Sequence, residues 1–98
     1  MKVMISQPMR GKTNEQIVEE RQEIINGLKQ EGLEVLDTII SENAPKDMDE
    51  AIYYLSKSIE FIGKVDCVYF MSGWEKARGC KIEHEVAVEY GKQVFYDN

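Results

Sequence analysis

The sequence predicts a single α/β domain, in which a four-stranded parallel sheet lies between two layers of helices. Short apolar segments alternate with amphipathic segments of helical spacing along the chain, and a glycine follows each amphipathic segment. Alternation of this kind implies parallel strands joined by right-handed crossovers. The 98 residues, of which 43% are hydrophobic, suffice for one core but not for two, so we expect residues 1–98 to form one complete domain.

The first half of the chain predicts a strand, a helix and a second strand. Lys2–Ser6 is a short apolar run that ends in polar residues, as a buried strand does. Thr13 and Gln16 have the spacing of a capping box, in which each side chain hydrogen bonds to the other residue's backbone. They open a helix that we expect to stop near Gly32. Residues 33–40 are rich in β-branched side chains and predict the second strand.

The second half repeats this alternation. Asp47 is the expected N-cap of a second helix, which continues to residue 62 and ends at Gly63 as its terminator. Residues 65–71 are almost entirely apolar, as a strand in the centre of a parallel sheet should be. A third helix is expected at 79–90 and the last strand at 94–96.

The composition argues against several classes of function. A net charge of −6 disfavours binding to a nucleic-acid polymer, which needs a basic surface. No apolar run approaches the ~20 residues that cross a bilayer, and the N-terminus lacks a secretory pattern, so we expect a cytoplasmic protein with no membrane partner. Two cysteines and one histidine make no metal-ligand pattern, and we expect neither a metal nor a cofactor.

Two loops mark the expected ligand site. We expect the strand order 2-1-3-4, which is flavodoxin- or Rossmann-like, and in such sheets ligands bind beyond the carboxyl ends of the strands at the topological switch. Residues 6–12 and 72–79 are expected there, and both loops contain glycines and basic residues. Small basic loops on an acidic protein suit a small anion, so the sequence predicts a nucleotide-like ligand beside the first and third strands.

The first loop has the composition of an anion site. Gly11 precedes a capped helix and lets a ligand approach the backbone amides, while Arg10 can donate two hydrogen bonds to a phosphate or carboxylate. The alternative is an ordinary turn with solvated Arg10 and Lys12, since turns with a single glycine are common.

Glu83 is the candidate nucleophile. It lies four residues after Gly79 in the first turns of the third helix, where the helix dipole keeps a carboxylate ionised; a solvated glutamate is the alternative. Trp74 can stack on a base or pack on the domain as a lid residue. His84 is expected at the surface or behind the site, because the spacing identifies no partner. Arg21 can reach a ligand or pair with neighbouring glutamates.

With these motifs in place, the sequence resembles the nucleoside 2-deoxyribosyltransferase-like superfamily, and more narrowly its compact, uncharacterised DUF4406-like members from phages and bacteria. The resemblance covers nearly the whole chain. Three stretches carry it, and the last is the most specific: residues 3–11 (VMISQPMRG), 58–70 (SIEFIGKVDCVYF) and 73–85 (GWEKARGCKIEHE).

This resemblance implies a glutamate that attacks the anomeric carbon of a nucleoside or deoxynucleotide, and Glu83 occupies the matching position. It also implies that Ser6, Arg10 and Gly11 bind a 5′-phosphate. With the rest of the two loops and one residue of the second helix, the expected ligand-binding set is Ser6, Gln7, Pro8, Met9, Arg10, Gly11, Ser58, Ser72, Gly73, Trp74, Arg78 and Gly79.

Two positions depart from the pattern of the active members, which carry aspartates where this chain has Ser58 and Ala77. Those aspartates position or protonate the substrate, and a proton donor is worth roughly 10²–10⁴-fold in rate. The expected function is an N-glycosidase or deoxyribosyltransferase acting on nucleosides or nucleoside 5′-monophosphates. The alternative is a non-catalytic protein that sequesters or senses a nucleotide-derived signal, such as a phage anti-defence sponge.

We also expect a homo-oligomer, because a domain of this size gains burial by association. The acidic and aromatic helix predicted at residues 50–62 is the candidate interface.

Overall fold

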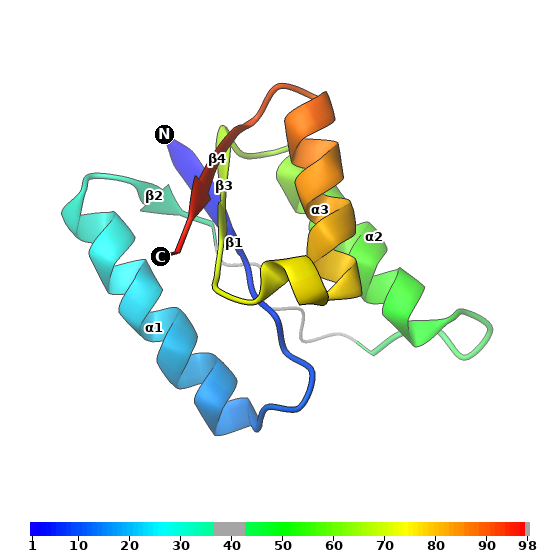
Figure 1. Cartoon of the computed structure of the whole chain (residues 1–98). Helices are drawn as coiled ribbons and strands as arrows, with labels where there is room; N and C mark the ends of the chain where they lie inside the picture. Colours follow the sequence, from blue (N-terminus) through cyan, green and yellow to red (C-terminus); the bar gives the residue numbers. More distant parts are fainter. Residues whose placement is uncertain (37–42, 98) are drawn as a thin grey trace.

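Four strands and three α-helices alternate along the computed structural model, which describes residues 1–36 and 43–97 (Figure 1). A 3₁₀ helix, η1, precedes the last α-helix. In chain order the elements are β1 (Lys2–Ser6), α1 (Asn14–Gln30), β2 (Glu34–Val35), α2 (Glu50–Ile62), β3 (Cys67–Phe70), η1 (Trp74–Lys76), α3 (Arg78–Glu89) and β4 (Gln93–Tyr96).

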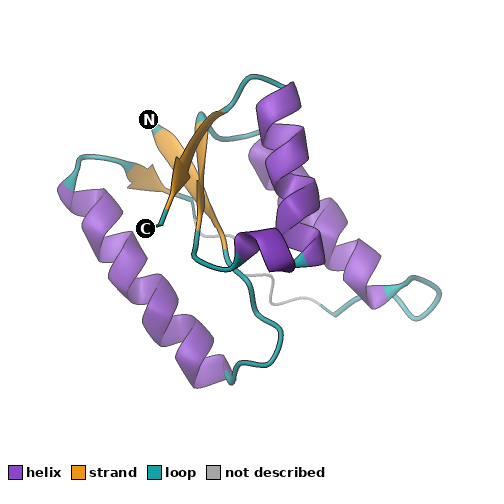
Figure 2. Cartoon of the chain, in the orientation of Figure 1, coloured by secondary structure: helices purple, strands orange, loops and turns teal. Residues whose placement is uncertain are grey.

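The sheet is parallel with the order β2-β1-β3-β4, which confirms the predicted order. β1 and β3 pair from Val3 opposite Cys67 to Ser6 opposite Phe70. Helix α1 lies on one side of the sheet, and α2 and α3 lie on the other (Figure 2). The carboxyl ends of β1 and β3 are therefore neighbours at the point where the strand order reverses, which is where ligands of such sheets bind.

Strand β1 illustrates why the central strands are apolar on both faces. Successive side chains of a strand point to opposite faces of the sheet. Val3 and Ile5 pack with Leu28 of α1, whereas Met4 packs with Ala87 of α3 on the other face. Val3, Met4 and Ile5 are all buried, so a single strand contributes to both cores.

The predicted start of α1 is confirmed. The Thr13 hydroxyl accepts a hydrogen bond from the Gln16 amide at 3.2 Å, and the Gln16 side chain accepts one from the Thr13 amide at 2.9 Å. This capping box satisfies two backbone donors at the helix N-terminus. Gly32 follows the helix with a φ of 84°, a left-handed conformation that favours glycine.

The predicted N-cap of α2 was wrong by two residues. The cap is Asp49, whose carboxylate accepts a hydrogen bond from the Ile52 amide at 3.1 Å, and not Asp47. Both aspartates have cap chemistry, but the chain first makes a turn in which the Met48 amide donates to the Pro45 carbonyl. Because of this turn, the helix begins only at Glu50, and Asp49 is the residue in position to cap it.

Other boundaries also differ from the prediction. The strand predicted at 65–71 is limited to Cys67–Phe70, because Val65 still belongs to the turn after α2, where its amide donates to the Ile62 carbonyl. Gly63 does cap α2, but with a right-handed φ of −66°. The second strand is observed at Glu34–Val35, and positions 37–40 of that prediction lie outside the described residues.

Helix η1 was not predicted, and α3 begins one residue earlier than expected, at Arg78. In the described part of the chain, no helix has the length and apolar character needed to cross a membrane.

Candidate functional site

The fold brings Ser6 and Glu83 together although they are 77 residues apart in the sequence. The Ser6 hydroxyl donates a hydrogen bond to Oε2 of Glu83 at 2.9 Å. Ser6 is the last residue of β1, and Glu83 lies in the second turn of α3. Their exposed fractions are only 1% and 7%, so the solvated alternative for Glu83 was wrong. The pair lies at the predicted end of the sheet, on the face covered by α2 and α3.

A third element contributes to the same cluster. Ser58 of α2 is half-buried and its hydroxyl hydrogen bonds to Glu83. Burial raises the pKa of the Glu83 carboxyl above its ordinary value, and the hydrogen bonds from Ser6 and Ser58 partly oppose this rise. Two hydroxyl donors thus stabilise a carboxylate that has lost most of its contact with water.

Cys80 lies beside this carboxylate, and its thiol is buried. Burial raises the pKa of its thiol to about 11; the hydrogen bond with Ser6 lowers it, and the nearby Glu83 carboxylate raises it further. A thiol with this pKa stays protonated at neutral pH, whereas the thiolate is the reactive form. Cys80 is therefore a neutral neighbour of the Glu83 carboxyl at neutral pH.

The two predicted loops also meet. Gly73 has a φ of 91°, a left-handed conformation, and a side-chain carbon built on it would lie 3.8 Å from Cγ of Pro8. The segment after β1 and the segment after β3 are therefore in near contact above the carboxyl ends of their strands. This geometry agrees with the placement of both loops at the topological switch.

The predicted anion-binding residues lie at the surface of this region. Met9, Arg10, Gly11, Arg78 and Gly79 are all exposed. Lys12 is engaged elsewhere, because its ammonium group pairs with Glu20 at 2.8 Å. Arg10 and Arg78 therefore keep their guanidinium groups at the protein surface, where a charged ligand can meet them.

Gln7 follows Ser6 in the chain and is also buried, with an exposed fraction of 7%, but its side chain points to the other face of the sheet. Its Nε2 donates a hydrogen bond to the Ile17 carbonyl of α1 at 2.9 Å. Its Oε1 is also buried, and no donor of the described residues hydrogen bonds to it. Gln7 was predicted only as a member of the ligand-binding loop, and nothing in the local pattern indicated this burial.

Trp74 packs on the domain. Its ring is stacked on His84 with 4.2 Å between the ring centroids and contacts Phe70 at 5.4 Å. His84 is half-buried, and its Nε2 lies 2.6 Å from the hydroxyl of Tyr96. Trp74 thus packs on the domain, and its stacking on a ligand base stays a prediction. His84 has a partner that spacing did not reveal, because Tyr96 comes from β4.

Ser72 is directed elsewhere than the Glu83 cluster. Its hydroxyl donates to Oδ2 of Asp97 at 3.2 Å. The Tyr69 hydroxyl donates to Oδ1 of the same carboxylate at 3.3 Å. Arg21 is buried on α1, with an exposed fraction of 2%.

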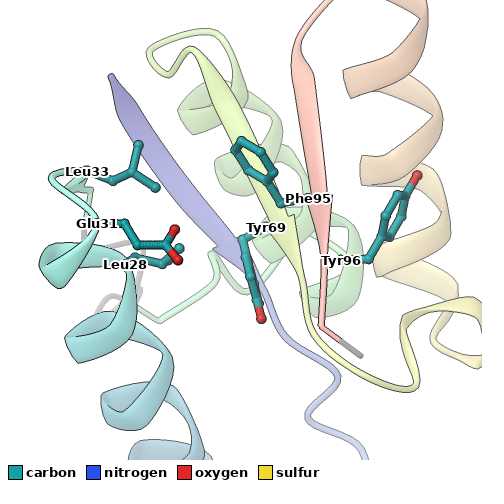
Figure 3. Close-up of a pocket in the computed structure, with 6 residues that line it drawn as sticks. All are labelled: Leu28, Glu31, Leu33, Tyr69, Phe95 and Tyr96. Atoms are coloured by element: carbon teal, nitrogen blue, oxygen red, sulfur yellow. The ribbon is translucent and has the colours of Figure 1, made fainter.

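A pocket of about 320 Å³ lies on the α1 side of the sheet, away from Glu83 (Figure 3). None of the predicted ligand-binding residues lines it. Its lining residues come from the end of α1, the following turn and the last two strands: Leu28, Glu31, Leu33, Tyr69, Phe95 and Tyr96. Within residues 1–36 and 43–97, no group of three acidic, cysteine or histidine side chains has the arrangement of a metal site.

Comparison with known proteins identifies the family but not the activity. A family model described as Domain of unknown function (DUF4406) matches residues 1–96. A search of curated proteins found no match. The wider resemblance to nucleoside 2-deoxyribosyltransferases therefore stays a prediction. Because the match spans nearly the entire chain, the protein belongs to the DUF4406 family.

Proposed function

We propose that this protein binds a nucleoside or nucleoside 5′-monophosphate and cleaves or transfers its N-glycosidic bond, with Glu83 as the nucleophile. The observation that carries the proposal is the buried Ser6–Glu83 hydrogen bond at the carboxyl end of β1. A buried carboxylate oriented by hydroxyl donors, beside loops that bear exposed arginines, combines a nucleophile with a means of binding an anion.

The chemistry follows from the carboxylate. Ionised Glu83 attacks the anomeric carbon, the bond between that carbon and the base nitrogen breaks, and the base leaves with the electron pair. Water or a second base then attacks the same carbon and releases Glu83. Ser6 and Ser58 hold the carboxylate in one orientation, and burial removes the hydration that would weaken it as a nucleophile.

The charged end of the ligand has its own partners in this proposal. Arg10 is exposed on the loop after β1, and Gly11 has a φ of 80° in the turn that leads to the N-terminus of α1. Backbone amides at a helix N-terminus and a guanidinium group both favour a phosphate. The 5′-phosphate would bind there while the sugar lies near Glu83.

One observation favours the second candidate, a protein that binds such a ligand without turning it over. The hydrogen bonds to Glu83 come from the hydroxyls of Ser6 and Ser58. In the described part of the chain, neither of these two partners is an acidic side chain. A departing base needs a proton. Without a proton donor of the protein, the site would retain binding and lose most of its rate, which suits sequestering or sensing a nucleotide-derived signal.

The test is incubation with nucleosides, nucleoside 5′-monophosphates, and cyclic and ADP-ribose-type nucleotides, followed by chromatography, with melting temperatures measured in parallel. Release of free base by the wild type and its loss in Glu83→Gln support the enzyme. Glu85→Gln, an exposed change on the same helix, is the matched control. A raised melting temperature with intact ligand supports the second candidate, and Ser58→Asp then tests whether an acid restores turnover. No change with any compound refutes both.

We also propose a cytoplasmic location and a homo-oligomer. Both cysteines are free thiols, as cytosolic cysteines usually are. Helix α2 exposes Ile52 by 57% and Ile59 by 36%, and their separation of seven residues places them on one face. Light scattering should give a mass above 11.3 kDa, and Ile52→Glu should reduce it to the monomer. A monomeric wild type would refute the oligomer.

A further inference from the structure

The side chain of Gln7 has one satisfied end and one unsatisfied end. Nε2 donates to the Ile17 carbonyl at 2.9 Å, but Oε1 receives no hydrogen bond from the described residues. Gln7 is buried, with only 7% of its surface exposed. Buried polar atoms in native proteins nearly always have a partner, so a lone acceptor at such a position calls for an explanation.

The orientation of the amide is determined by its neighbour. If the amide were reversed, Oε1 would face the Ile17 carbonyl oxygen, and two acceptors would meet without a proton between them. The hydrogen bond to Ile17 therefore assigns Nε2 to α1 and leaves Oε1 as the open acceptor. The unsatisfied group is a neutral carbonyl oxygen, which can only accept.

Its position relates it to the candidate site. Gln7 directly follows Ser6, and neighbouring Cα atoms lie about 3.8 Å apart. Ser6 contacts Glu83 of α3, whereas Gln7 contacts α1, so the two side chains diverge from the end of β1 toward opposite layers. Pro8, the next residue, lies near Gly73 of the second loop. A ligand that contacts both residues must lie across the end of β1, with one part toward α3 and another toward α1.

We propose that Oε1 of Gln7 accepts a hydrogen bond from an uncharged donor of the ligand, either a sugar hydroxyl or an amino group of the base. This inference rests on the proposed function and adds selectivity to it. A phosphate oxygen at neutral pH is itself an acceptor and is repelled by a carbonyl oxygen. Gln7 therefore does not share the phosphate-binding role of the rest of its loop, and it selects ligands that present a donor at this position.

The size of the effect follows from the loss of one neutral hydrogen bond. A ligand analogue that lacks the donor leaves Oε1 buried without a partner and should bind about tenfold more weakly. In Gln7→Met, which has a similar shape but no acceptor, the analogue and the parent ligand should bind equally. The variant should melt close to the wild type, because it loses the bond to Ile17 but also removes the unsatisfied oxygen.

The experiment is a calorimetric titration in the Glu83→Gln background, which keeps the ligands intact. The probes are adenosine and cytidine 5′-monophosphates, their 2′,3′-dideoxy forms, and the corresponding ribosides without the exocyclic amino group. A tenfold loss with the dideoxy probes, present with Gln7 and absent in Gln7→Met, identifies a sugar hydroxyl. The same pattern with the probes that lack the amino group identifies the base. Gln22→Met on the exposed side of α1 is the control.

Equal binding of all probes to proteins with and without Gln7 would overturn the inference and leave the proposed function standing. Failure of every probe to bind would overturn both. If Gln7→Met does not fold, the carbonyl ¹³C resonance of Gln7 provides a second measurement in the unaltered side chain. It should shift when a parent ligand is added and stay in place with the analogue that lacks the donor; the same shift with both would contradict the proposal.

Discussion

Replacing Ser6 by alanine tests the energetics of the site without the ligand. The change removes the hydroxyl that donates to Oε2 of Glu83 at 2.9 Å, and both residues are at least nine-tenths buried. Hydrogen bonds to charged groups contribute roughly 1.5–3 kcal/mol, and those between neutral groups roughly 0.5–1.5 kcal/mol. Ser6→Ala should therefore lower the free energy of unfolding by about 2 kcal/mol where Glu83 is ionised, and by about 1 kcal/mol where it is protonated.

Urea unfolding at pH 4 and pH 8, followed by the fluorescence of the single tryptophan, Trp74, measures both values. Ser56→Ala is the control, because Ser56 lies exposed on α2 and hydrogen bonds only to the Tyr53 carbonyl in the described structure. The hydrogen bond from Ser6 lowers the pKa of Glu83, so its loss must cost more at the higher pH. If Ser6→Ala unfolds with the wild-type free energy at pH 8, or loses the same free energy at both pH values, the hydrogen bond to ionised Glu83 does not contribute as expected.

Three further outcomes are expected. Glu83→Gln should exceed the wild type in stability at pH 8 but match it closely at pH 4, because burial raises the Glu83 pKa and the folded protein loses stability as the pH rises from 4.5 through that value; urea unfolding at both pH values checks this. Cys80, with a pKa of about 11, should resist alkylation at pH 8 until the protein is unfolded, and mass spectrometry of the treated protein would detect a reactive thiol. Gly73→Ala should destabilise the fold by about 1 kcal/mol because φ is 91°, whereas Gly79→Ala, which meets open space in α3, should be neutral or slightly stabilising in thermal unfolding.

The fold could be predicted because its signals are local and repeated. Each helix of the described chain has a polar cap residue or a glycine at one of its ends, and the central strands are apolar because both faces are covered. The N-cap of α2 could not be assigned with the same accuracy. Asp47 and Asp49 have identical chemistry, and only the turn before them decides which one reaches the helix amides.

The site was predictable in part. Topology places the end of β1 beside the start of α3, which is why Glu83 and Ser6 could be assigned to one region before their hydrogen bond was seen. The contact between His84 and Tyr96 depends on the exact position of β4 against α3, which no local pattern encodes. The unsatisfied oxygen of Gln7 likewise depends on how its side chain packs in the folded chain, which no local pattern encodes.

The most direct test of Glu83 as the nucleophile is to detect the covalent intermediate. The protein is incubated with the nucleosides and nucleoside 5′-monophosphates of the panel, quenched in acid within the first turnovers, and analysed by mass spectrometry of the intact chain and of its peptides. If Glu83 is the nucleophile, an adduct with the mass of the sugar or sugar phosphate is expected on the peptide that contains Glu83, and no adduct is expected in Glu83→Gln. Base release without an adduct on Glu83, or release that persists in Glu83→Gln, would contradict the assignment of Glu83 as the nucleophile.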